Sequence, residues 1–387
     1  MVALGVSYMN RLFDSLQISG YRGIKMVDLP QLGQVNIFVG NNNSGKTSLL
    51  EAISILCNPL DPFQWIGISQ RRTYIVSSSL LALRLNIEAI KWIFPQNIRS
   101  STTEFYQSEI SITARGNTPI IGIKARFNEL YGSGEERPSR DSLNEDIPSP
   151  EADAVRPGVE IDVMAHLRTG QLDLFTSEPE RKELFQFWEN ERFIQRKRNE
   201  PFVKNATIFP SYSSSEPLLS RLTQIILDEV GGGKGEVLEL IRYFDANILD
   251  IQILSTPRDR AVLYIEHKEL GFAPLYTFGD GLKRALAIAL TLLTTKNGVL
   301  LIDEIETSIH VSALSKVFSW LTETCRQRKI QLFVTTHSLE AIDAMLQTEI
   351  ATDDIVAFRL NSEGQPPQRF SGDLLHRLRS ERGLDVR

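Results

Sequence analysis

One short stretch of the chain carries residues whose types and spacing suit phosphate chemistry. It follows the pattern G-x-x-x-x-G-K-[ST] between an apolar run at 35–39 and a helical run at 48–53. In that setting, backbone N–H groups of the loop and the helix N-terminus form a pocket for phosphate oxygens. The sequence therefore predicts a nucleoside triphosphate site. Its residues are Gly40, Asn41, Asn42, Asn43, Ser44, Gly45, Lys46, Thr47 and Ser48.

Two side chains of this loop have separate roles in such chemistry. The Lys46 ammonium is expected to reach the β- and γ-phosphates of ATP, and the Thr47 hydroxyl is expected to ligate Mg²⁺. A glycine turn with a chance lysine is the alternative. Because both the strand and the helix are present around the loop, the phosphate site is the better interpretation.

A pair of carboxylates ends a second apolar run at 299–302. Such a run fits a strand buried on both faces of a parallel sheet, where ligand groups project from the carboxyl ends of strands. Asp303 is placed to hold Mg²⁺, and Glu304 to orient the water that attacks the γ-phosphate. Either residue alone could be a helix cap or a surface carboxylate.

A third strand end carries a histidine. The run at 331–335 leads to His337, which could report the γ-phosphate by hydrogen bonding. A lone histidine in such a place is more often a satisfied core residue. Here its position matches that of a known switch residue, so we count His337 with Glu304 and Lys46 as a candidate catalytic residue.

A second anion site is predicted where a glycine-rich turn precedes the helix at 281–293. Exposed N–H groups at that helix start can bind phosphate oxygens. The residues concerned are Gly279, Asp280, Gly281 and Lys283. Two phosphate-binding surfaces in one chain predict a homodimer in which one subunit's loop completes the other's site.

Near the start of the chain, Tyr21 and Arg22 lie between two predicted strands. An aromatic ring or a guanidinium at this place could stack on adenine. An edge strand with a surface pair explains them equally well. Both interpretations assume that the two strands, within 12–27, form a small antiparallel sheet.

The elements that must position these residues predict an α/β fold. The last part of the chain alternates helices and strands in a doubly wound pattern. In chain order the predicted elements are strand 206–209, helices 217–230 and 236–245, strands 248–254 and 261–265, helix 281–293, strand 299–302, helix 311–321, strand 331–335, helix 339–345, strand 355–360 and a helix near 372–382.

The middle of the chain has a different pattern. Alternating runs predict a lobe of antiparallel strands at 109–113, 120–125, 159–163 and 172–175. The polar, proline-rich stretch 132–157 predicts a mobile surface loop. The stretch 178–199 looks helical and mixes bases with aromatics, which predicts either a solvated basic face or a polynucleotide contact.

These patterns divide the chain into three parts. The region 12–57 holds the N-terminal part of the core with the phosphate loop, 58–205 an inserted β lobe with a helical segment, and 206–387 the rest of the core. The first strand signal begins near Leu12, so Met9 could be the true start instead of Met1.

Composition restricts the class of protein. A chain of 387 residues with 42% hydrophobic and 23% charged residues is typical of a water-soluble globular protein. No apolar run of about 18 residues and no signal-peptide pattern occurs, which predicts a cytoplasmic protein with no membrane contact. Cys57 and Cys325 read as reduced core residues. The net charge of −6 disfavours a protein that coats nucleic acid.

The order of these motifs resembles the ABC-type ATPases of the SMC, RecF and OLD group over most of the chain. The segment 40–47 looks like Walker A, 278–282 like the signature motif, 299–304 like Walker B with its catalytic glutamate, and His337 like the switch histidine. The resemblance implies a P-loop fold with an ABC-type parallel core sheet, an antiparallel β lobe and a helical insertion, with ATP and Mg²⁺ as cofactors.

The closest resemblance is to OLD-like ATPases of the AAA family, in which the Asn42 to Ser44 loop, the Gly-Asp-Gly signature and the acidic 303–306 segment followed by His310 are typical. Two features depart from the wider pattern. Gly279 replaces the signature serine, so Asp280, Lys283 or backbone N–H groups must substitute for its hydroxyl. Only about fifty residues follow the switch histidine, so no TOPRIM nuclease domain is expected. Gln107 is a weak candidate for the Q-loop glutamine of the wider family.

Three functions remain open. The resemblance implies an ATPase that dimerises on ATP and drives or gates a separately encoded effector, plausibly in prokaryotic anti-phage defence. The alternatives are a RecF-like DNA-repair clamp that uses the basic segment 192–198, and an ATP-gated scaffold with negligible turnover. DNA binding is possible but not established by the sequence.

Overall fold

The computed structural model describes eleven segments of the chain, and all statements below concern them. They are residues 11–71, 86–96, 107–133, 155–168, 180–189, 200–208, 216–228, 233–255, 261–347, 354–361 and 365–387. The strand expected at 172–175, the basic segment 192–198 and residues 134–154 of the expected loop lie outside these segments.

The core is a six-stranded sheet that brings distant parts of the sequence together. Strands β3, β13, β12 and β8 run parallel to one another, β14 runs parallel to β3, and only the edge strand β15 is antiparallel. This arrangement confirms the predicted α/β fold with a parallel core. Across the sheet the strands are β15 (Gln368–Ser371), β14 (Ile355–Arg359), β3 (Val35–Val39), β13 (Gln331–Thr335), β12 (Gly298–Ile302) and β8 (Lys204–Ile208).

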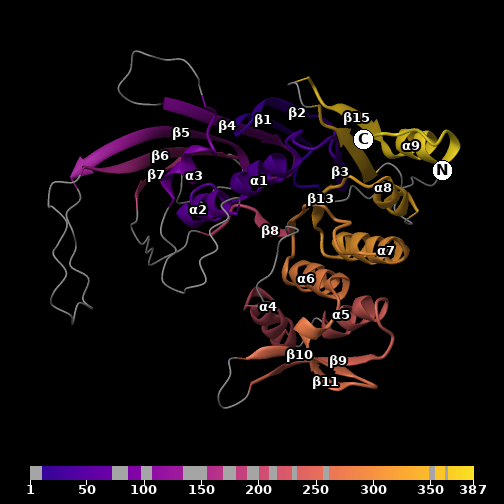
Figure 1. Cartoon of the computed structure of the whole chain (residues 1–387). Coiled ribbons are helices and arrows are strands. Elements are labelled where there is room, and N and C mark those ends of the chain that lie inside the picture. Colours follow the sequence, from indigo (N-terminus) through magenta and orange to yellow (C-terminus); the bar gives the residue numbers. More distant parts are fainter. Residues whose placement is uncertain are drawn as a thin grey trace, which may run out of the picture.

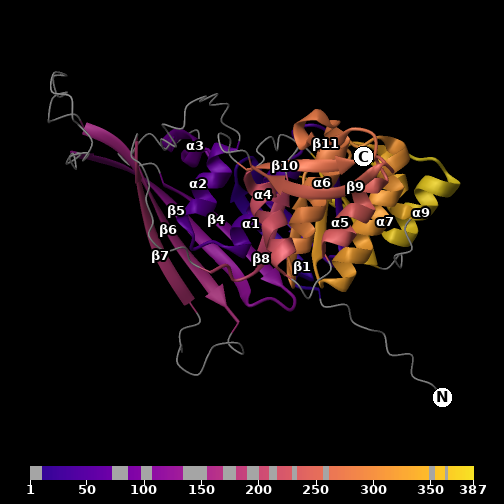
Figure 2. The ribbon, with the colours of Figure 1, turned by 90° about the horizontal axis from the view of Figure 1, so that it is seen from below.

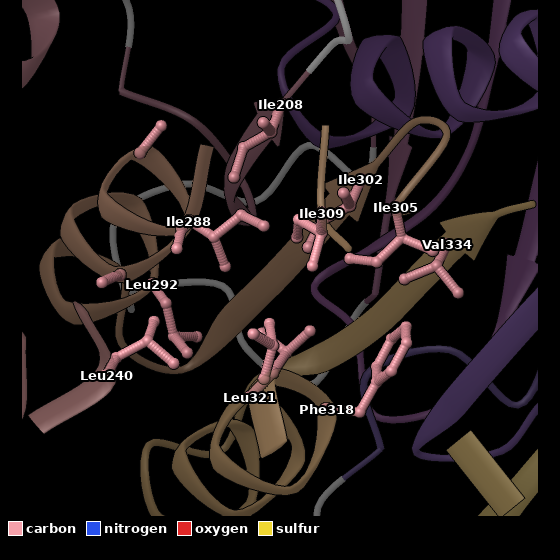
Figure 3. Close-up of a cluster of buried hydrophobic side chains, with 14 of the residues drawn as sticks. Ile208, Leu240, Ile288, Leu292, Ile302, Ile305, Ile309, Phe318, Leu321 and Val334 are labelled. Atoms are coloured by element: carbon pink, nitrogen blue, oxygen red, sulfur yellow. The ribbon is translucent and has the colours of Figure 1, made fainter. Parts of the chain in front are cut away.

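Helices and a second sheet cover the two faces of this core sheet. Helix α1 (Lys46–Cys57) lies on one face, and α6 (Asp280–Thr294), α7 (Val311–Gln327) and α8 (Leu339–Leu346) lie on the other (Figure 1). Alternate residues of β12 point to opposite faces, which is why every one of them is apolar and buried. Figure 3 shows the cluster on the α6 and α7 side, which includes Ile302, Val334 and Phe318.

The second sheet is antiparallel and extends away from the core to one side (Figure 2). Its first two strands come before the phosphate loop. They pair with each other in antiparallel fashion, as expected within 12–27, but the sheet is not small, because β1 also pairs with β4 of the lobe. In order across the sheet the strands are β2 (Ile24–Leu29), β1 (Ser15–Tyr21), β4 (Gln107–Arg115), β5 (Ile120–Ser133), β6 (Val155–Leu167) and β7 (Glu180–Trp188).

The helix expected at 178–199 is also wrong over its described part. Residues 180–188 form β7, in which Phe185 and Phe187 are buried opposite Ile161 and Val159 of β6. Their spacing of two is the strand period. Of the charged neighbours that suggested a solvated helix face, Arg181 and Lys182 are described, and both are exposed. The ends of β5 and β6 likewise extend into both ends of the loop expected at 132–157.

The remaining elements complete the two faces. Helices α4 (Glu216–Leu227) and α5 (Gly233–Arg242) pack on α6. A three-stranded sheet of β9 (Ile248–Leu254), β10 (Val262–His267) and β11 (Gly271–Pro274) lies beyond them and contacts α5 through β9. A 3-10 turn, η1 (Leu275–Thr277), leads from β11 into α6. Helices α2 (Pro62–Gln70) and α3 (Ile87–Lys91) were not among the expected elements. The chain ends in α9 (Gly372–His376) and a π-helical turn (Arg377–Glu381).

Two further expectations can be compared with the structure. Cys57 in α1 and Cys325 in α7 are fully buried and unbridged, as predicted for core residues. Among the described helices, none combines the length and the apolar character that crossing a bilayer requires.

The aromatic contact on the α1 side of the core sheet provides a test of this packing. Phe333 of β13 is fully buried and stacks on Phe38 of β3, with ring centroids 6.1 Å apart. We expect Phe333→Ala to lower the free energy of unfolding by about 3–5 kcal/mol, because a large buried ring is lost and leaves a cavity. Urea denaturation measures the loss. Leu184→Ala on β7, where the side chain is 56% exposed, is the control and should cost far less; equal losses would contradict the described core.

Candidate active site

The phosphate loop has the backbone that its glycines were expected to provide. Gly40 and Gly45 have φ values of 142° and 92°, in the region that favours glycine. A Cβ atom on Gly40 would lie 2.5 Å from the Leu360 carbonyl oxygen, so the loop is pressed against the end of β14. Helix α1 begins at Lys46 with no side-chain cap on its first turn. Its first N–H groups therefore point into the loop, as anion binding requires.

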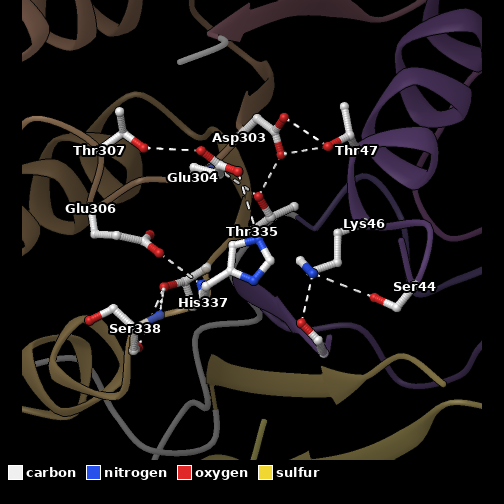
Figure 4. A network of polar contacts seen from close by, with 12 residues as sticks. Ser44, Lys46, Thr47, Asp303, Glu304, Glu306, Thr307, Thr335, His337 and Ser338 are labelled. Carbon is white, nitrogen blue, oxygen red and sulfur yellow. Dashed lines mark hydrogen bonds and ion pairs between the residues drawn. The ribbon is translucent and has the colours of Figure 1, made fainter. Parts of the chain in front are cut away.

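Lys46 is buried inside this loop. Its Nζ atom donates to the Gly40 carbonyl at 2.7 Å and to the Asn41 carbonyl at 2.8 Å, and it lies 3.5 Å from the Ser44 hydroxyl (Figure 4). Burial is the largest influence and lowers the pKa of Lys46, whereas the nearby carboxylates partly oppose that shift. Oxygen atoms thus hold the ammonium at the centre of the loop. Phosphate oxygens can accept the same hydrogen bonds.

Asp303 joins the phosphate loop to two strands of the core sheet. Its Oδ2 accepts a hydrogen bond from the Thr47 hydroxyl at 2.9 Å, and its Oδ1 accepts one from the Thr335 hydroxyl at 2.6 Å (Figure 4). Only 4% of Asp303 is exposed. The two residues predicted as magnesium ligands, Thr47 and Asp303, therefore present oxygen atoms side by side, and such a donor pair fits Mg²⁺.

Glu304 sits in a backbone conformation that needs support. Its φ of 45° is in the left-handed region, which is uncommon for a residue with a side chain. Its N–H donates to the Thr335 hydroxyl at 2.8 Å, and this bond helps to hold the turn. The carboxylate accepts a hydrogen bond from Thr307 at 3.2 Å and is 41% exposed. A fixed, solvent-facing carboxylate next to Asp303 can accept a proton from water.

His337 lies across from Glu304, as the sequence predicted for two members of one site. Its Nε2 atom is 3.7 Å from Oε1 of Glu304, and its ring is 35% exposed (Figure 4). The backbone N–H of His337 donates to the Glu306 carboxylate at 2.7 Å. The histidine is therefore not a satisfied core residue, since its ring faces the open edge of the sheet.

Sequence reasoning missed Arg284, which stands one helical turn into α6. The residue is 6% exposed, and its Nη2 donates to the Asp303 carbonyl at 2.8 Å and approaches the Glu304 carbonyl at 3.4 Å. Burial lowers the pKa of Arg284 to about 10, an effect that the carboxylates of Asp303, Glu304 and Glu306 partly oppose. It remains charged at neutral pH. The apolar neighbours of Arg284 in α6 did not indicate a role in the site. The one available signal was that a charged residue lies on the buried face of this helix.

Thr335 was also missed. Its hydroxyl donates to Asp303 and accepts from the N–H of Glu304, so one side chain fixes both predicted carboxylates. It is the last residue of β13, two positions before His337. The one available signal was a polar side chain at the end of an otherwise apolar strand.

The predicted second anion site lies at the start of α6. Gly279 is exposed, precedes the helix as its N-cap and provides no side-chain cap. A Cβ atom placed on it would have no heavy atom within 4 Å, whereas one on Gly281 would lie 2.7 Å from the Ser308 carbonyl oxygen. Asp280 and Lys283 form an exposed ion pair at 2.9 Å. The first N–H groups of α6 therefore face outward, and Gly281 packs against the turn that follows Glu304.

The adenine contact predicted for Tyr21 is contradicted by the structure. The Tyr21 ring is fully buried, and its hydroxyl lies 3.3 Å from the Glu51 carboxylate. Arg22 forms a partly buried ion pair with the same carboxylate at 2.7 Å. The alternative of a surface pair is equally wrong, because these residues tie the β1–β2 turn to α1. No sequence pattern showed that Glu51, one turn beyond the phosphate loop, would be their partner.

Two residues named from the resemblance have simpler positions. His310 is the N-cap of α7 and accepts a hydrogen bond from the Ser312 N–H at 3.3 Å. Gln107 is the first residue of β4. Among the described residues no group of three or more His, Cys, Asp and Glu side chains could hold a metal by itself, so phosphate oxygens and water must complete any magnesium site.

The chain matches one protein-family model over residues 35–343, which include Lys46, Thr47, Asp303, Glu304 and His337. That family is described as "AAA domain, putative AbiEii toxin, Type IV TA system". A protein of Helicobacter pylori named "ATP/GTP phosphatase" is 23% identical over 361 residues, which are 87% of this chain and 88% of that protein.

Two other similarities are narrower or weaker. The uncharacterized protein MJECL11 of Methanocaldococcus jannaschii is 36% identical over 112 residues, which are 28% of this chain and 98% of that protein. The crystal structure of an Smc head domain with an extended coiled coil, bound to the C-terminal domain of ScpA from Pyrococcus furiosus, has a TM-score of 0.45 and 11% identity. The match covers 95% of this chain and 98% of that structure.

The buried guanidinium of Arg284 provides a test of how the site is held. We expect Arg284→Met to lower the free energy of unfolding by about 1.5–3 kcal/mol, because the buried Asp303 carbonyl loses a charged donor. Urea denaturation measures this. Lys283→Met, at the neighbouring and more exposed position, is the matched control. If both variants unfold at the same urea concentration, Arg284 does not stabilise the turn after β12.

Proposed function

Because this chain belongs to the AAA-domain family that its residues 35–343 match, and is an ATPase of that kind, we propose that it hydrolyses Mg·ATP as a dimer that gates a partner protein. The contact that supports this best is the bridge from Thr47 to Asp303, since it unites the phosphate loop with the strand that carries the carboxylates. Within the family, we assign the chain to the OLD-like ATPases on its motif pattern.

The phosphate loop binds the triphosphate in this proposal. Lys46 exchanges its bonds to the Gly40 and Asn41 carbonyls for phosphate oxygens, and the uncapped N–H groups of α1 contact the same anion. Thr47 and Asp303 hold Mg²⁺, which when bound neutralises part of the phosphate charge. Because Asp303 is also fixed by Thr335, its carboxylate has one preferred direction.

Glu304 acts on the attacking water, and His337 acts on the γ-phosphate. The Glu304 carboxylate is exposed at the edge of the sheet and accepts the proton of the water that approaches the γ-phosphate. His337, 3.7 Å from that carboxylate, donates a hydrogen bond to the γ-phosphate. The left-handed turn at Glu304 aims its side chain at this place, and the Thr335 hydroxyl and the Thr307 hydroxyl restrain it.

The start of α6 supports a dimeric site. Its first N–H groups have no side-chain cap, and Gly279 beside them is exposed with open space around it. A helix start of this kind favours an anion, and the partner subunit's γ-phosphate is that anion in a head-to-tail dimer. Backbone N–H groups then replace the hydroxyl of the signature serine. The Lys283 ammonium pairs with Asp280 at 2.9 Å and can exchange that carboxylate for a phosphate oxygen.

The partner is proposed to be a separately encoded effector. The family's description names a putative toxin and a toxin–antitoxin system, in which two proteins act together. ATP-driven opening and closing of the dimer then controls that second protein, plausibly in anti-phage defence. No contact in the described residues favours the DNA-clamp alternative: Arg126 on the outer face of the lobe sheet pairs with Glu109, and 192–198 is not described.

Replacement of the proposed base tests the chemistry. We expect Glu304→Gln to bind Mg·ATP with unchanged affinity, because the metal ligand Asp303 remains. Its rate of hydrolysis should fall by at least about a hundredfold, because the proton acceptor is lost. ATP should then hold the variant as a dimer, which light scattering detects. Glu323→Gln, on the exposed face of α7, is the control. A wild type with no turnover would favour a scaffold, and a monomeric, ATP-bound Glu304→Gln protein would refute the dimer.

Bulk at the start of α6 tests the composite site. The backbone angles of Gly279 suit any residue, and a Cβ atom there would have no heavy atom within 4 Å. Gly279→Leu should therefore fold and bind ATP. It should fail to hydrolyse ATP, because the added side chain keeps the partner subunit's γ-phosphate from the start of α6. Gly281 is the poorer position, because a side chain there meets Ser308 of its own chain. Gly235→Leu on α5, which also has open space, is the matched control.

The same variant allows a mixing experiment with Lys46→Ala, which should lose ATP binding. A mixed dimer contains one intact phosphate loop facing one intact α6 start, so mixing the two inactive proteins should restore part of the turnover. No recovery in a covalently linked heterodimer, together with crosslinks only within one subunit, would contradict the head-to-tail arrangement.

A further inference from the structure

His337 is held on both sides by charged side chains, and only one of them belongs to the site described above. Its N–H donates to the Glu306 carboxylate at 2.7 Å, and its carbonyl oxygen accepts a hydrogen bond from Nη1 of Arg387 at 3.0 Å. We propose that Arg387 is a positioning residue for ATP hydrolysis, which sets the direction of the His337 ring. The inference rests on the role proposed above for His337.

Arg387 is itself held in place before it reaches His337. Its Nη2 and Nε atoms donate to the two carboxylate oxygens of Asp385 at 2.9 and 3.1 Å. This hydrogen bonding lowers the pKa of Asp385 to about 2, so the pair stays charged at neutral pH. A guanidinium fixed by a two-pronged contact loses little freedom when it makes one more hydrogen bond.

The segment that carries Arg387 is anchored to the core. Val386 between the two charged residues is 3% exposed and belongs to the cluster on the α6 and α7 side of the sheet. The Leu384 N–H donates to the Leu378 carbonyl at 3.0 Å, and Arg379 donates to the Leu384 carbonyl at 2.7 Å while it also pairs with Asp343 of α8. Arg387 thus links this anchored segment to the loop after β13.

The His337 ring needs such a restraint. The side chain is 35% exposed, and the 3.7 Å between its Nε2 atom and the Glu304 carboxylate is too long for a hydrogen bond. A small rotation of the peptide group after His337 would therefore swing the ring away from the carboxylate. In catalysis a displacement of about 1 Å can cost about a hundredfold in rate.

Kinetics of two variants test the proposal. We expect Arg387→Ala to lower kcat about tenfold or more with KM for ATP within about twofold, because the ring is misplaced while the phosphate loop is intact. Arg387→Lys keeps a positive donor and should recover part of kcat. Arg382→Ala, an exposed arginine five positions earlier, is the matched control and should match the wild type. Equal kcat for Arg387→Ala and Arg382→Ala would overturn the proposal.

A second readout is independent of turnover. The chain has five histidines, and the ring resonance of His337 in proton NMR is identified by its absence in His337→Gln. Arg387→Ala should shift that resonance, and Arg387→Lys should shift it less. An unmoved resonance would overturn the positioning role even if kcat falls. If the wild type proves inactive, the proposed function fails, and the resonance still decides whether Arg387 sets the His337 ring.

Discussion

The site depends on one buried carboxylate, that of Asp303. It accepts hydrogen bonds from Thr47 in the first turn of α1 and from Thr335 at the end of β13, and it follows β12 directly. The start of one helix and the ends of two strands, all far apart in the sequence, therefore meet at one side chain. A register shift of one residue in β12 or β13 would turn its side chains to the opposite face and break the contact. The buried register of the parallel sheet is thus what makes the site possible.

The second constraint is the balance of charge around that carboxylate. Asp303, Glu304 and Glu306 lie close together, and two buried cations, Lys46 from α1 and Arg284 from α6, face them from opposite sides. Negative charges held this close together repel one another. The two cations offset that repulsion. The helices on both faces of the sheet therefore contribute charge as well as apolar cover.

How much the sequence predicted depended on whether the determining contacts were local. The phosphate loop, the run before Asp303 and the helices and strands of the core are set by glycine conformation and by apolar periods within a few residues, and the structure confirms these elements. Tyr21 and the segment 180–188 were misassigned because long-range partners decide them: Glu51 for the tyrosine and β6 for β7. Arg284 and Arg387 were missed for the same reason, since each acts on a residue far along the chain.

Helix α6 connects two features that the proposed dimer requires to communicate. Its uncapped start at Gly279 faces outward, and about one turn later Arg284 holds the carbonyls that follow β12. In a head-to-tail dimer, the partner subunit's γ-phosphate would bind the start of this helix, while Arg284 supports the catalytic turn of its own subunit. A rigid helix that moves at one end must move at the other, and Arg284 connects this helix to the left-handed turn at Glu304. Binding at one composite site would therefore reach the base of the second, which favours hydrolysis at the two sites in a coordinated way.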